Sequence, residues 1–385
     1  MNSTVRSMQI VVKVSKFCNL RCQYCYEYPE LGNRAAMSRS QLATMYRALR
    51  EHVLAVEERD GSGTRLEFIW HGGEPLMQPA RFYRQTLADQ REIFGERIAT
   101  TNSIQTNLTM LDPERRELLT DSFDSVGVSI DVVGGLRVNA AGRDSQPRVL
   151  ANLDELVAAG VPVGCISVLT ARNIHAVDRI FRFFEKRRLN FRVLPLFDTG
   201  EPGQTAAFEV PVAQELSALA RLIDLWLAGD VLEHPPAPLD HYVQIAAHYL
   251  ADAPGPDYRD RREWLPLILV NTDGSCFTYG EPYGDPAWSI GNIFTDRIAD
   301  MLAGPVFERC AVAAERRVAR NCLSCPFFDA CGGSLMAETE ARERDEDGHG
   351  TLLCTGRPVI AYIAEQLRGR VPDTVAQWRY LHSPA

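Results

Sequence analysis

Short apolar runs alternate with helical spacings of apolar residues from residue 8 to residue 197 of the chain. The apolar runs predict strands at Met8–Val14, Leu66–Trp70, Ser103–Gln105, Ser125–Ile130, Gly164–Leu169 and Phe191–Phe197. Helical spacing in the segments between them predicts helices at Ser40–Glu57, Pro79–Phe94, Pro113–Leu119, Pro147–Ala159 and His175–Arg187. About six strand–helix steps of this kind predict an α/β fold whose parallel sheet is open or curved into a partial TIM-like (β/α)6 barrel.

The pattern changes after residue 199. A breaker at 200–203 precedes helical spacings at 212–230 and 238–251, which indicate a helical bridge. From residue 265 the chain has short strands and turns, and then a cysteine-rich segment. We therefore predict four regions: a partial barrel at 1–205, a helical bridge at 206–262, a small α+β domain at 263–360 and a C-terminal helix or tail at 361–385.

Composition narrows the class of protein and its compartment. Of the 385 residues, 45% are hydrophobic, so the chain can bury a sizeable core. With a net charge of −9, nothing in the composition indicates a nucleic-acid-binding stripe, although individual basic patches stay open. No apolar stretch reaches the ~18 residues of a membrane span. Residues 1–7 lack the apolar core of a signal peptide, so we expect a cytoplasmic protein. Ten cysteines in a reducing compartment favour metal or cluster ligation over disulfides.

Three cysteines follow the first predicted strand with the spacing C-x3-C-x2-C, namely Cys18, Cys22 and Cys25. Three thiols are one short of the four that close a cubane iron–sulfur cluster, so one iron keeps an open position for a substrate or cofactor. The alternative is a closed structural zinc or iron site that a distant cysteine completes. Cys165 stands alone in an apolar run and is expected in the core.

The second predicted strand ends in the run Trp-His-Gly-Gly-Glu-Pro at residues 70–75. Gly72 and Gly73 permit close approach of the backbone, and Glu74 adds a carboxylate that can accept hydrogen bonds from an ammonium group. Ligands of parallel α/β sheets bind at the carboxyl ends of the strands, where this run and the cysteine loop both lie. The run alone is a weak turn signal, and its place one strand from the cysteine loop makes it specific.

The two motifs together resemble the radical S-adenosylmethionine (SAM) superfamily. The resemblance implies that Cys18, Cys22 and Cys25 hold a [4Fe–4S] cluster whose fourth iron chelates the amino and carboxylate groups of SAM. It also implies that one electron cleaves SAM to methionine and a 5′-deoxyadenosyl radical, which abstracts a substrate hydrogen. The protein then supplies binding, orientation and exclusion of water.

The family pattern assigns cofactor contacts to several residues of the barrel. Gly72, Gly73 and Glu74 match the segment that binds the methionine ammonium group. Tyr24, inside the cysteine loop, matches the aromatic residue beside the adenine. Leu196 matches an apolar residue that contacts the adenine, and a plain core position is the alternative.

The fourth predicted strand leads to two more contacts in the family pattern. Ser129 matches a serine at a strand end near the cofactor, and Arg137 matches the arginine whose guanidinium meets the methionine carboxylate. Arg143 competes with Arg137, because the loop between Asp131 and Gly142 is shorter than the pattern leads us to expect. No catalytic base is assigned. Asp131 and His71 are candidates only by their place at the sheet edge, and capping of a strand is the alternative for His71.

A second group of cysteines, with the spacing C-x2-C-x5-C and a distant fourth, comprises Cys322, Cys325, Cys331 and Cys354. With the runs at 273–275 and 291–293, it resembles the SPASM extension of radical enzymes that modify peptides or other substrates. The resemblance implies that the four thiolates bind an auxiliary [4Fe–4S] cluster in a small iron–sulfur domain. A zinc ribbon with four cysteine ligands is the alternative that the spacing permits.

The chain departs from the two-cluster form of that extension. Leu335 stands where the full pattern has a cysteine, and Cys276 comes three residues before the cysteine position expected near Tyr279. The stretch at 210–262 contains no cysteine. We therefore predict one auxiliary cluster, which is an electron relay or a structural staple, and leave the roles of Cys276 and Cys310 open.

The resemblance implies a radical SAM oxidoreductase that abstracts hydrogen from a peptide side chain and installs a cross-link or oxidative modification in a ribosomally made precursor peptide. Residues 70–76 and 103–107 also resemble the sulfatase-maturing branch, which oxidises a Cys or Ser to formylglycine but keeps both auxiliary clusters. Dehydrogenation or epimerisation of a small molecule is another enzymatic alternative. A non-enzymatic iron–sulfur or zinc scaffold would turn over no SAM.

The expected partners follow from this chemistry. A precursor peptide is the substrate, and a flavodoxin or ferredoxin is an electron donor of the required kind. Because the chain starts only a few residues before the first predicted strand, we expect leader-peptide binding to need a separate protein or another surface. Neither nucleic acid nor a membrane is expected as a partner.

Overall fold

A computed structural model describes residues 6–196, 207–253, 267–278, 283–337 and 354–368, together with residues 255, 260 and 262. The predicted breaker at 200–203, the last residue of the sixth predicted strand, Tyr279 and the tail after residue 368 lie outside this part of the chain. None of the helices within it is long and apolar enough to span a bilayer.

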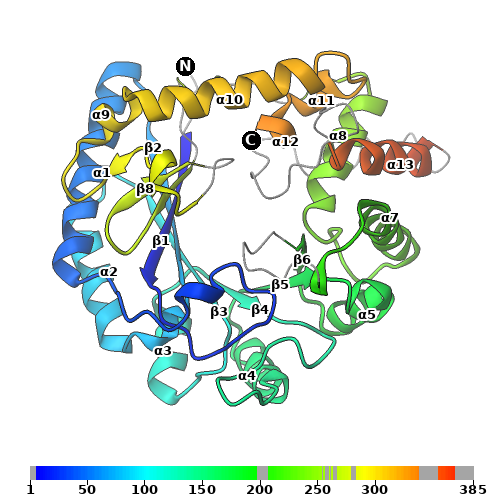
Figure 1. The fold of residues 1–385 in the computed structure, drawn as a ribbon, viewed down its shortest axis with the longest axis horizontal. Coiled ribbons are helices and arrows are strands. Elements are labelled where there is room, and N and C mark those ends of the chain that lie inside the picture. Colours follow the sequence, from blue (N-terminus) through cyan, green and yellow to red (C-terminus); the bar gives the residue numbers. More distant parts are fainter. Residues whose placement is uncertain are drawn as a thin grey trace.

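Six parallel strands, β1 to β6, neighbour one another in chain order within a nine-stranded sheet. Their bounds are β1 Arg6–Ser15, β2 Thr64–Gly72, β3 Thr100–Thr106, β4 Ser125–Ser129, β5 Val163–Leu169 and β6 Phe191–Pro195. An order without reversal places every crossover helix on the same face, so the sheet curves around its other face. Figure 1 shows the strands as an inner row with the helices outside. The predicted partial (β/α)6 barrel is confirmed.

Five helices connect these strands, with the bounds α1 Arg39–Asp60, α2 Ala80–Phe94, α3 Pro113–Asp121, α4 Gln146–Ala158 and α5 Val177–Arg187. Helix α1 begins with a capping box, in which Ser38 and Gln41 satisfy each other's backbone N–H groups. It ends at Gly61, whose φ of 68° suits the left-handed cap. These two signals extend α1 beyond the range that apolar spacing alone predicted.

The C-terminal extension continues the barrel sheet. Strand β7 (Leu267–Val270) pairs in parallel with β1, and β8 (Ser275–Phe277) and β9 (Gly291–Asn292) follow in antiparallel order. The other helices of the described part are α7 Val212–Ala228, α8 Leu239–Leu250, α9 Ile298–Leu302, α10 Pro305–Asn321, α11 Phe328–Cys331, α12 Ser334–Ala337 and α13 Gly356–Arg368. Helix α13 packs on α8 and α7, beside the barrel end that carries α5 (Figure 1). The four-region division stays a prediction.

One continuous hydrophobic core runs through the barrel and the extension. Its largest fully buried side chains are aromatic, and Trp70, Tyr83 and Phe68 pack edge to face or stacked with one another and with neighbouring rings. Cys165, at 2% exposure, belongs to this core, as the sequence predicted. A core that includes residues of both parts fixes the extension against the barrel.

Candidate active site

The three clustered cysteines lie in the loop after β1 and open onto one cavity of about 170 Å³ at the carboxyl ends of the barrel strands. Cys18 and Cys22 are buried, and Cys25 is half-buried. The cavity is also lined by most of the residues that the sequence assigned to the cofactor, namely Tyr24, Gly72, Gly73, Ser129, Arg137 and Leu196. The topology therefore brings together residues that span most of the barrel sequence.

Gly72, the last residue of β2, and Gly73 hold the start of the cysteine loop, and we call these two residues the glycine clamp. The N–H of Gly73 donates to the carbonyl of Ser15 at 2.8 Å, and the N–H of Glu74 donates to that of Phe17 at 2.9 Å. A Cβ on Gly72 would lie 2.1 Å from the Ser15 carbonyl oxygen, and the φ of Gly72 is +130°. Only glycine permits this approach, so the clamp fixes the loop backbone just before the first cysteine.

Glu74 is buried, and protein groups already engage its side chain. Its carboxylate accepts from the N–H of Leu76 at 2.8 Å, from the hydroxyl of Thr106 at 2.7 Å and from the N–H of Asn107 at 2.7 Å. Burial raises the pKa of the carboxyl group, and these donors oppose that shift. The carboxylate ties β2 to the loop after β3, and Glu74 is not among the residues that line the cavity.

Tyr24, Asp131 and Arg137 form a hydrogen-bonded chain at the cavity. The Tyr24 hydroxyl donates to Asp131 Oδ2 at 2.5 Å and accepts from Arg137 Nη1 at 2.9 Å. Within the described residues, Arg137 Nε and Asp131 Oδ1 are buried and have no hydrogen-bond partner. Burial raises the pKa of Asp131 despite the nearby guanidinium. An unpaired guanidinium N–H beside the cavity suits an anionic group such as a carboxylate.

The two competing arginines occupy different surroundings. Arg137 lines the cavity, whereas Arg143 is exposed to solvent. Asp131 lies behind Tyr24 and does not line this cavity, although it borders a smaller space next to Arg137. Ser129 faces the cavity and accepts from Gln105 Nε2 at 2.8 Å. The geometry therefore favours Arg137 for a carboxylate contact.

A buried ion pair adjoins the cavity next to Cys25. Lys13, which is 2% exposed, donates to Tyr26 Oη and to Glu27 Oε1, both at 2.6 Å. Its ammonium also lies 4.9 Å from the ring centroid of Tyr283, which comes from the extension. Burial lowers the pKa of Lys13, but Glu27, Tyr26 and Tyr283 together outweigh burial and raise the pKa well above the usual value. The amine is therefore charged and links the first strand to the loop and the extension.

His71 lines the same wall as a neutral imidazole. Its Nδ1 accepts from the backbone N–H of Gly72 at 2.7 Å, so the remaining ring proton sits on Nε2. Burial, followed by the positive charge of Lys13, lowers the pKa of His71 to about 3. The ring therefore acts as a hydrogen-bond donor at neutral pH.

The thiol chemistry of the cavity fits a metal cluster. Burial raises the pKa of Cys18 and of Cys25 to about 12, and it also raises the pKa of Cys22. Thiolates at these positions therefore need a cation to stabilise them, as iron does. Three thiols with an unpaired guanidinium nearby fit a three-cysteine [4Fe–4S] cluster that carries a carboxylate-bearing ligand.

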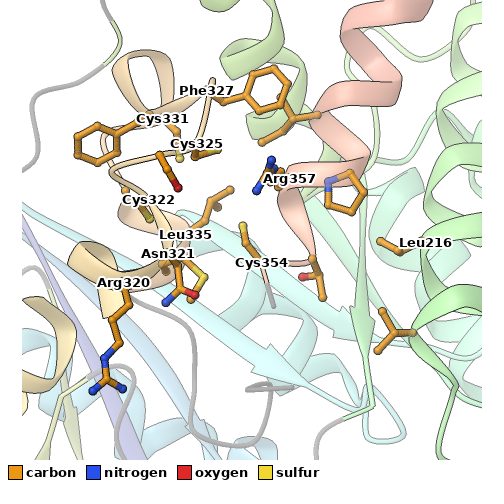
Figure 2. Close-up of a pocket in the computed structure, with 18 residues that line it drawn as sticks. Leu216, Arg320, Asn321, Cys322, Cys325, Phe327, Cys331, Leu335, Cys354 and Arg357 are labelled. Atoms are coloured by element: carbon orange, nitrogen blue, oxygen red, sulfur yellow. The ribbon is translucent and has the colours of Figure 1, made fainter. Parts of the chain in front are cut away.

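The second group of cysteines lines a separate cavity of about 420 Å³ between α10, α11 and α13. Figure 2 shows Cys322, Cys325 and Cys331 on one wall and Cys354 facing them from the segment before α13. Burial, followed by the three neighbouring thiols, raises the pKa of Cys322 to about 12. No three Cys, His, Asp or Glu side chains of the described part converge tightly enough for a single metal ion. A cubane differs in taking each thiolate at a separate corner.

The cysteines whose roles the sequence left open are core residues. Cys276 is fully buried, its thiol donates to the Gly274 carbonyl at 3.4 Å, and burial raises its pKa to about 12. Cys310 is 6% exposed and packs in the main core from α10. Leu335 lines the second cavity near Cys331, where the full two-cluster pattern has a cysteine.

Several residues of the site were missed at the level of sequence. Asn107 and Gln105 line the cavity from the end of β3, and Glu27 lines it beside Cys25 and pairs with Lys13 behind it. A lysine inside the apolar run of β1 was an available signal, because a charged side chain inside a central strand needs a buried partner. The partners themselves come from the cysteine loop and could not be read from spacing.

This fold and this site define a class of protein. Residues 12–184 match the family described as "Radical SAM superfamily", and the chain therefore contains a radical SAM domain. A serine-type anaerobic sulfatase-maturating enzyme of Bacteroides thetaiotaomicron is 24% identical over 91% of this chain and 88% of its own length. A cysteine-type enzyme of Clostridium perfringens is 23% identical over 90% of this chain and 92% of its own length.

Solved structures share the fold of nearly the whole chain, including its SPASM-like extension. The structure of anSMEcpe with bound AdoMet and the Cp18Cys peptide covers 96% of this chain and 99% of its own, at 17% identity and a TM-score of 0.73. Streptococcus suis SuiB bound to the precursor peptide SuiA covers 91% of this chain and 77% of its own, at 16% identity and a TM-score of 0.57.

Proposed function

We propose that this chain is a radical SAM enzyme that abstracts hydrogen from a peptide side chain and so installs a cross-link or an oxidative modification. The observation that carries the proposal is the single cavity lined by three thiols, the glycine clamp and Arg137. A bound [4Fe–4S] cluster with SAM would supply the hydrogen-abstracting radical at this place.

The residues that line the cavity would have different roles in binding the cluster and SAM. Cys18, Cys22 and Cys25 would bind three irons and leave the fourth open. The guanidinium of Arg137 would hold the carboxylate of SAM, and its bond to Tyr24 orients it. Tyr24 and Leu196 would cover the adenine and, by filling the wall, exclude water from the reacting centre.

The C-terminal cysteines would bind one auxiliary [4Fe–4S] cluster. The four thiols on one cavity support this part of the proposal, and the core positions of Cys276 and Cys310 leave no second group of four among the described residues. The auxiliary cluster would either transfer electrons or have a structural role, in which its cysteine ligands link the start of α13 to the segment between α10 and α12. An electron donor such as flavodoxin or ferredoxin, a leader-peptide-binding protein and a cytoplasmic location belong to the same proposal.

A peptide substrate is supported by the peptide-bound structures of the same fold, anSMEcpe and SuiB. A second candidate is formylglycine formation in a sulfatase, which is favoured by the relatives that span most of this chain. The two candidates differ in the peptide accepted and in the bond changed. Small-molecule dehydrogenation or epimerisation and a non-enzymatic scaffold remain as further alternatives.

The first experiment counts iron and sulfide in the anaerobically reconstituted protein. We expect about eight of each, since each cubane holds four, and about twelve would overturn the single auxiliary cluster. Replacing Cys18, Cys22 and Cys25 by Ala should remove about four irons and abolish 5′-deoxyadenosine formation with dithionite. Cys165→Ala is the matched control, because this buried thiol lies in the core and should leave both readouts unchanged. Wild-type protein that forms no 5′-deoxyadenosine would refute the radical assignment.

The second experiment separates the substrates. The reconstituted protein is incubated with SAM, dithionite and sulfatase peptides that carry Cys or Ser at the modified position, with an Ala peptide as control. Formylglycine detected by mass spectrometry would support sulfatase maturation. Turnover of SAM without any change in these peptides would favour another peptide as substrate, and a peptide encoded beside the gene is then the one to test.

A further inference from the structure

Asn107 places a side-chain amide next to the first cysteine of the cluster loop. Its Nδ2 lies 3.7 Å from Cys18 Sγ, within hydrogen-bonding range of sulfur. The residue is 5% exposed, and its backbone N–H donates to Glu74 Oε2 at 2.7 Å. A side chain held this firmly beside a cluster ligand can orient and polarise that ligand.

A closed ring of hydrogen bonds fixes the orientation of this amide. Asn107 Nδ2 donates to Asn19 Oδ1 at 2.9 Å, and Asn19 Nδ2 donates to Thr109 Oγ1 at 2.8 Å. The Thr109 hydroxyl closes the ring by donating to Asn107 Oδ1 at 2.7 Å. The ring joins the cysteine loop to the loop after β3 and lies at the cavity edge.

The direction of every bond in the ring is determined. The backbone N–H of Thr109 also donates to Asn107 Oδ1 at 3.0 Å, and an N–H cannot accept. The oxygen of the amide must therefore face Thr109 and its nitrogen must face Asn19 and Cys18. One amide hydrogen goes to Asn19, so the other is left for the sulfur.

The backbone at Leu108 supports the same arrangement, although its conformation is strained. Leu108, between the two ring residues, has a φ of +52°, which is unfavourable for a residue with a branched side chain. Its N–H donates to the Thr106 hydroxyl at 2.9 Å, and its carbonyl accepts from Asn152 at 2.8 Å. The surrounding hydrogen bonds hold a strained turn that lets both the backbone N–H and the hydroxyl of Thr109 donate to Asn107 Oδ1.

We infer that Asn107 is a positioning residue that raises the reduction potential of the cluster bound by Cys18, Cys22 and Cys25, through an N–H that the Asn19–Thr109 ring aims at Cys18. Reduction adds negative charge, part of which resides on the sulfur ligands. A hydrogen bond to sulfur stabilises the reduced state more than the oxidised state, so it raises the potential. The inference rests on the proposed function, because it needs the cluster.

Four variants of the full-length reconstituted protein test the inference. Asn107→Leu removes the donor to sulfur, and Asn107→Asp places a second anion beside it. Thr109→Val removes the hydroxyl that holds the amide, whereas Thr109→Ser keeps it. The readout is the midpoint potential of the cluster whose electron paramagnetic resonance signal changes when SAM is added, together with iron content.

We expect the midpoint potential to fall in Asn107→Leu, to fall further in Asn107→Asp and to fall slightly in Thr109→Val, with Thr109→Ser like the wild type. A merely structural role would change iron content or unfolding but leave the potential of the loaded cluster unchanged. If the Asn107 variants do not bind iron, the Thr109 pair decides. Equal potentials in Thr109→Val and Thr109→Ser would then overturn the inference, as would an unchanged potential in Asn107→Leu. A wild-type protein without the cluster would instead sink the proposed function.

Discussion

The guanidinium of Arg137 donates to the hydroxyl of Tyr24 at 2.9 Å, although the two residues are 113 positions apart in the chain. This bond leaves Arg137 Nε buried and unpaired beside a cavity that three thiols also line. The family pattern places Tyr24 at the adenine of SAM and Arg137 at its carboxylate. The hydrogen bond between the two residues means that Tyr24 also orients Arg137.

Arg137→Met should weaken SAM binding by about 10- to 100-fold, because a hydrogen bond to a charged group contributes about 1.5–3 kcal/mol. Arg143→Met is the matched control, since Arg143 is exposed and lines no part of the cavity. Binding is measured by equilibrium dialysis on the cluster-loaded protein. Equal losses in the two variants would contradict the assignment of the carboxylate contact to Arg137.

Gly73→Ala should detach the cysteine loop. The new Cβ would lie 2.3 Å from the carbonyl oxygen of Lys16 and 2.5 Å from that of Phe17, so the backbone must move. We expect a loss of about 1–3 kcal/mol in unfolding free energy and a lower iron content. Gly164→Ala, in strand β5, meets nothing within 4 Å and should keep wild-type stability and iron. Full iron content in Gly73→Ala would show that the clamp does not fix the loop.

Glu27→Ala should destabilise the protein by about 3–5 kcal/mol, because it leaves the buried ammonium of Lys13 without its counter-charge. Replacing both residues by apolar ones, Lys13→Met with Glu27→Leu, should recover most of that loss. The control is Glu30→Ala, whose partner Lys16 stands at the same spacing but nearer the solvent, and which should cost less than about 1 kcal/mol. Chemical denaturation gives the three values. Similar losses for the two pairs would exclude a special role for burial.

His71 should make stability depend on pH. Its folded pKa of about 3 lies below the unfolded value of 6.5, so the unfolded chain binds the extra proton between these values. Stability contributed by the neutral ring is therefore complete above pH ~6.5 and falls by up to about 1.4 kcal/mol per pH unit below it. His71→Asn keeps an acceptor for the N–H of Gly72 but does not titrate. Unfolding midpoints of the two proteins should converge as pH falls from 7.5 to 5.5, and parallel curves would refute the effect.

Much of the fold and of the cofactor wall could be predicted because each depends on local pattern. Apolar runs located all six barrel strands, and the position of Cys18 and Gly73 after successive parallel strands guaranteed that they would meet at one edge. The same rule brought Ser129 and Leu196 to that edge. The sequence pattern therefore predicts the positions of those residues that are fixed by the order of the strands.

The rest depends on contacts between side chains distant in sequence. Nothing in the spacing of Lys13 and Glu27 indicates that their charges meet, since this needs the fold of the cysteine loop. Glu74 was assigned to a cofactor contact by the family pattern, yet its oxygens accept three hydrogen bonds from protein groups. The length of α1 was underestimated because caps, and not apolar spacing, decide where it begins and ends.

Strand β7 covers the side of β1 that β2 leaves free, over residues Gln9 to Val12. Without it, the first strand of the barrel would present a row of unsatisfied peptide groups to other chains, which is a template for aggregation. A shortened protein that stops before Leu267 would therefore expose the edge of β1 and tend to aggregate. Hybrid proteins that exchange the extension between relatives must keep the pairing of β7 with β1. The C-terminal part is in this sense a piece of the barrel wall, which restricts how freely it can be exchanged in evolution or in the laboratory.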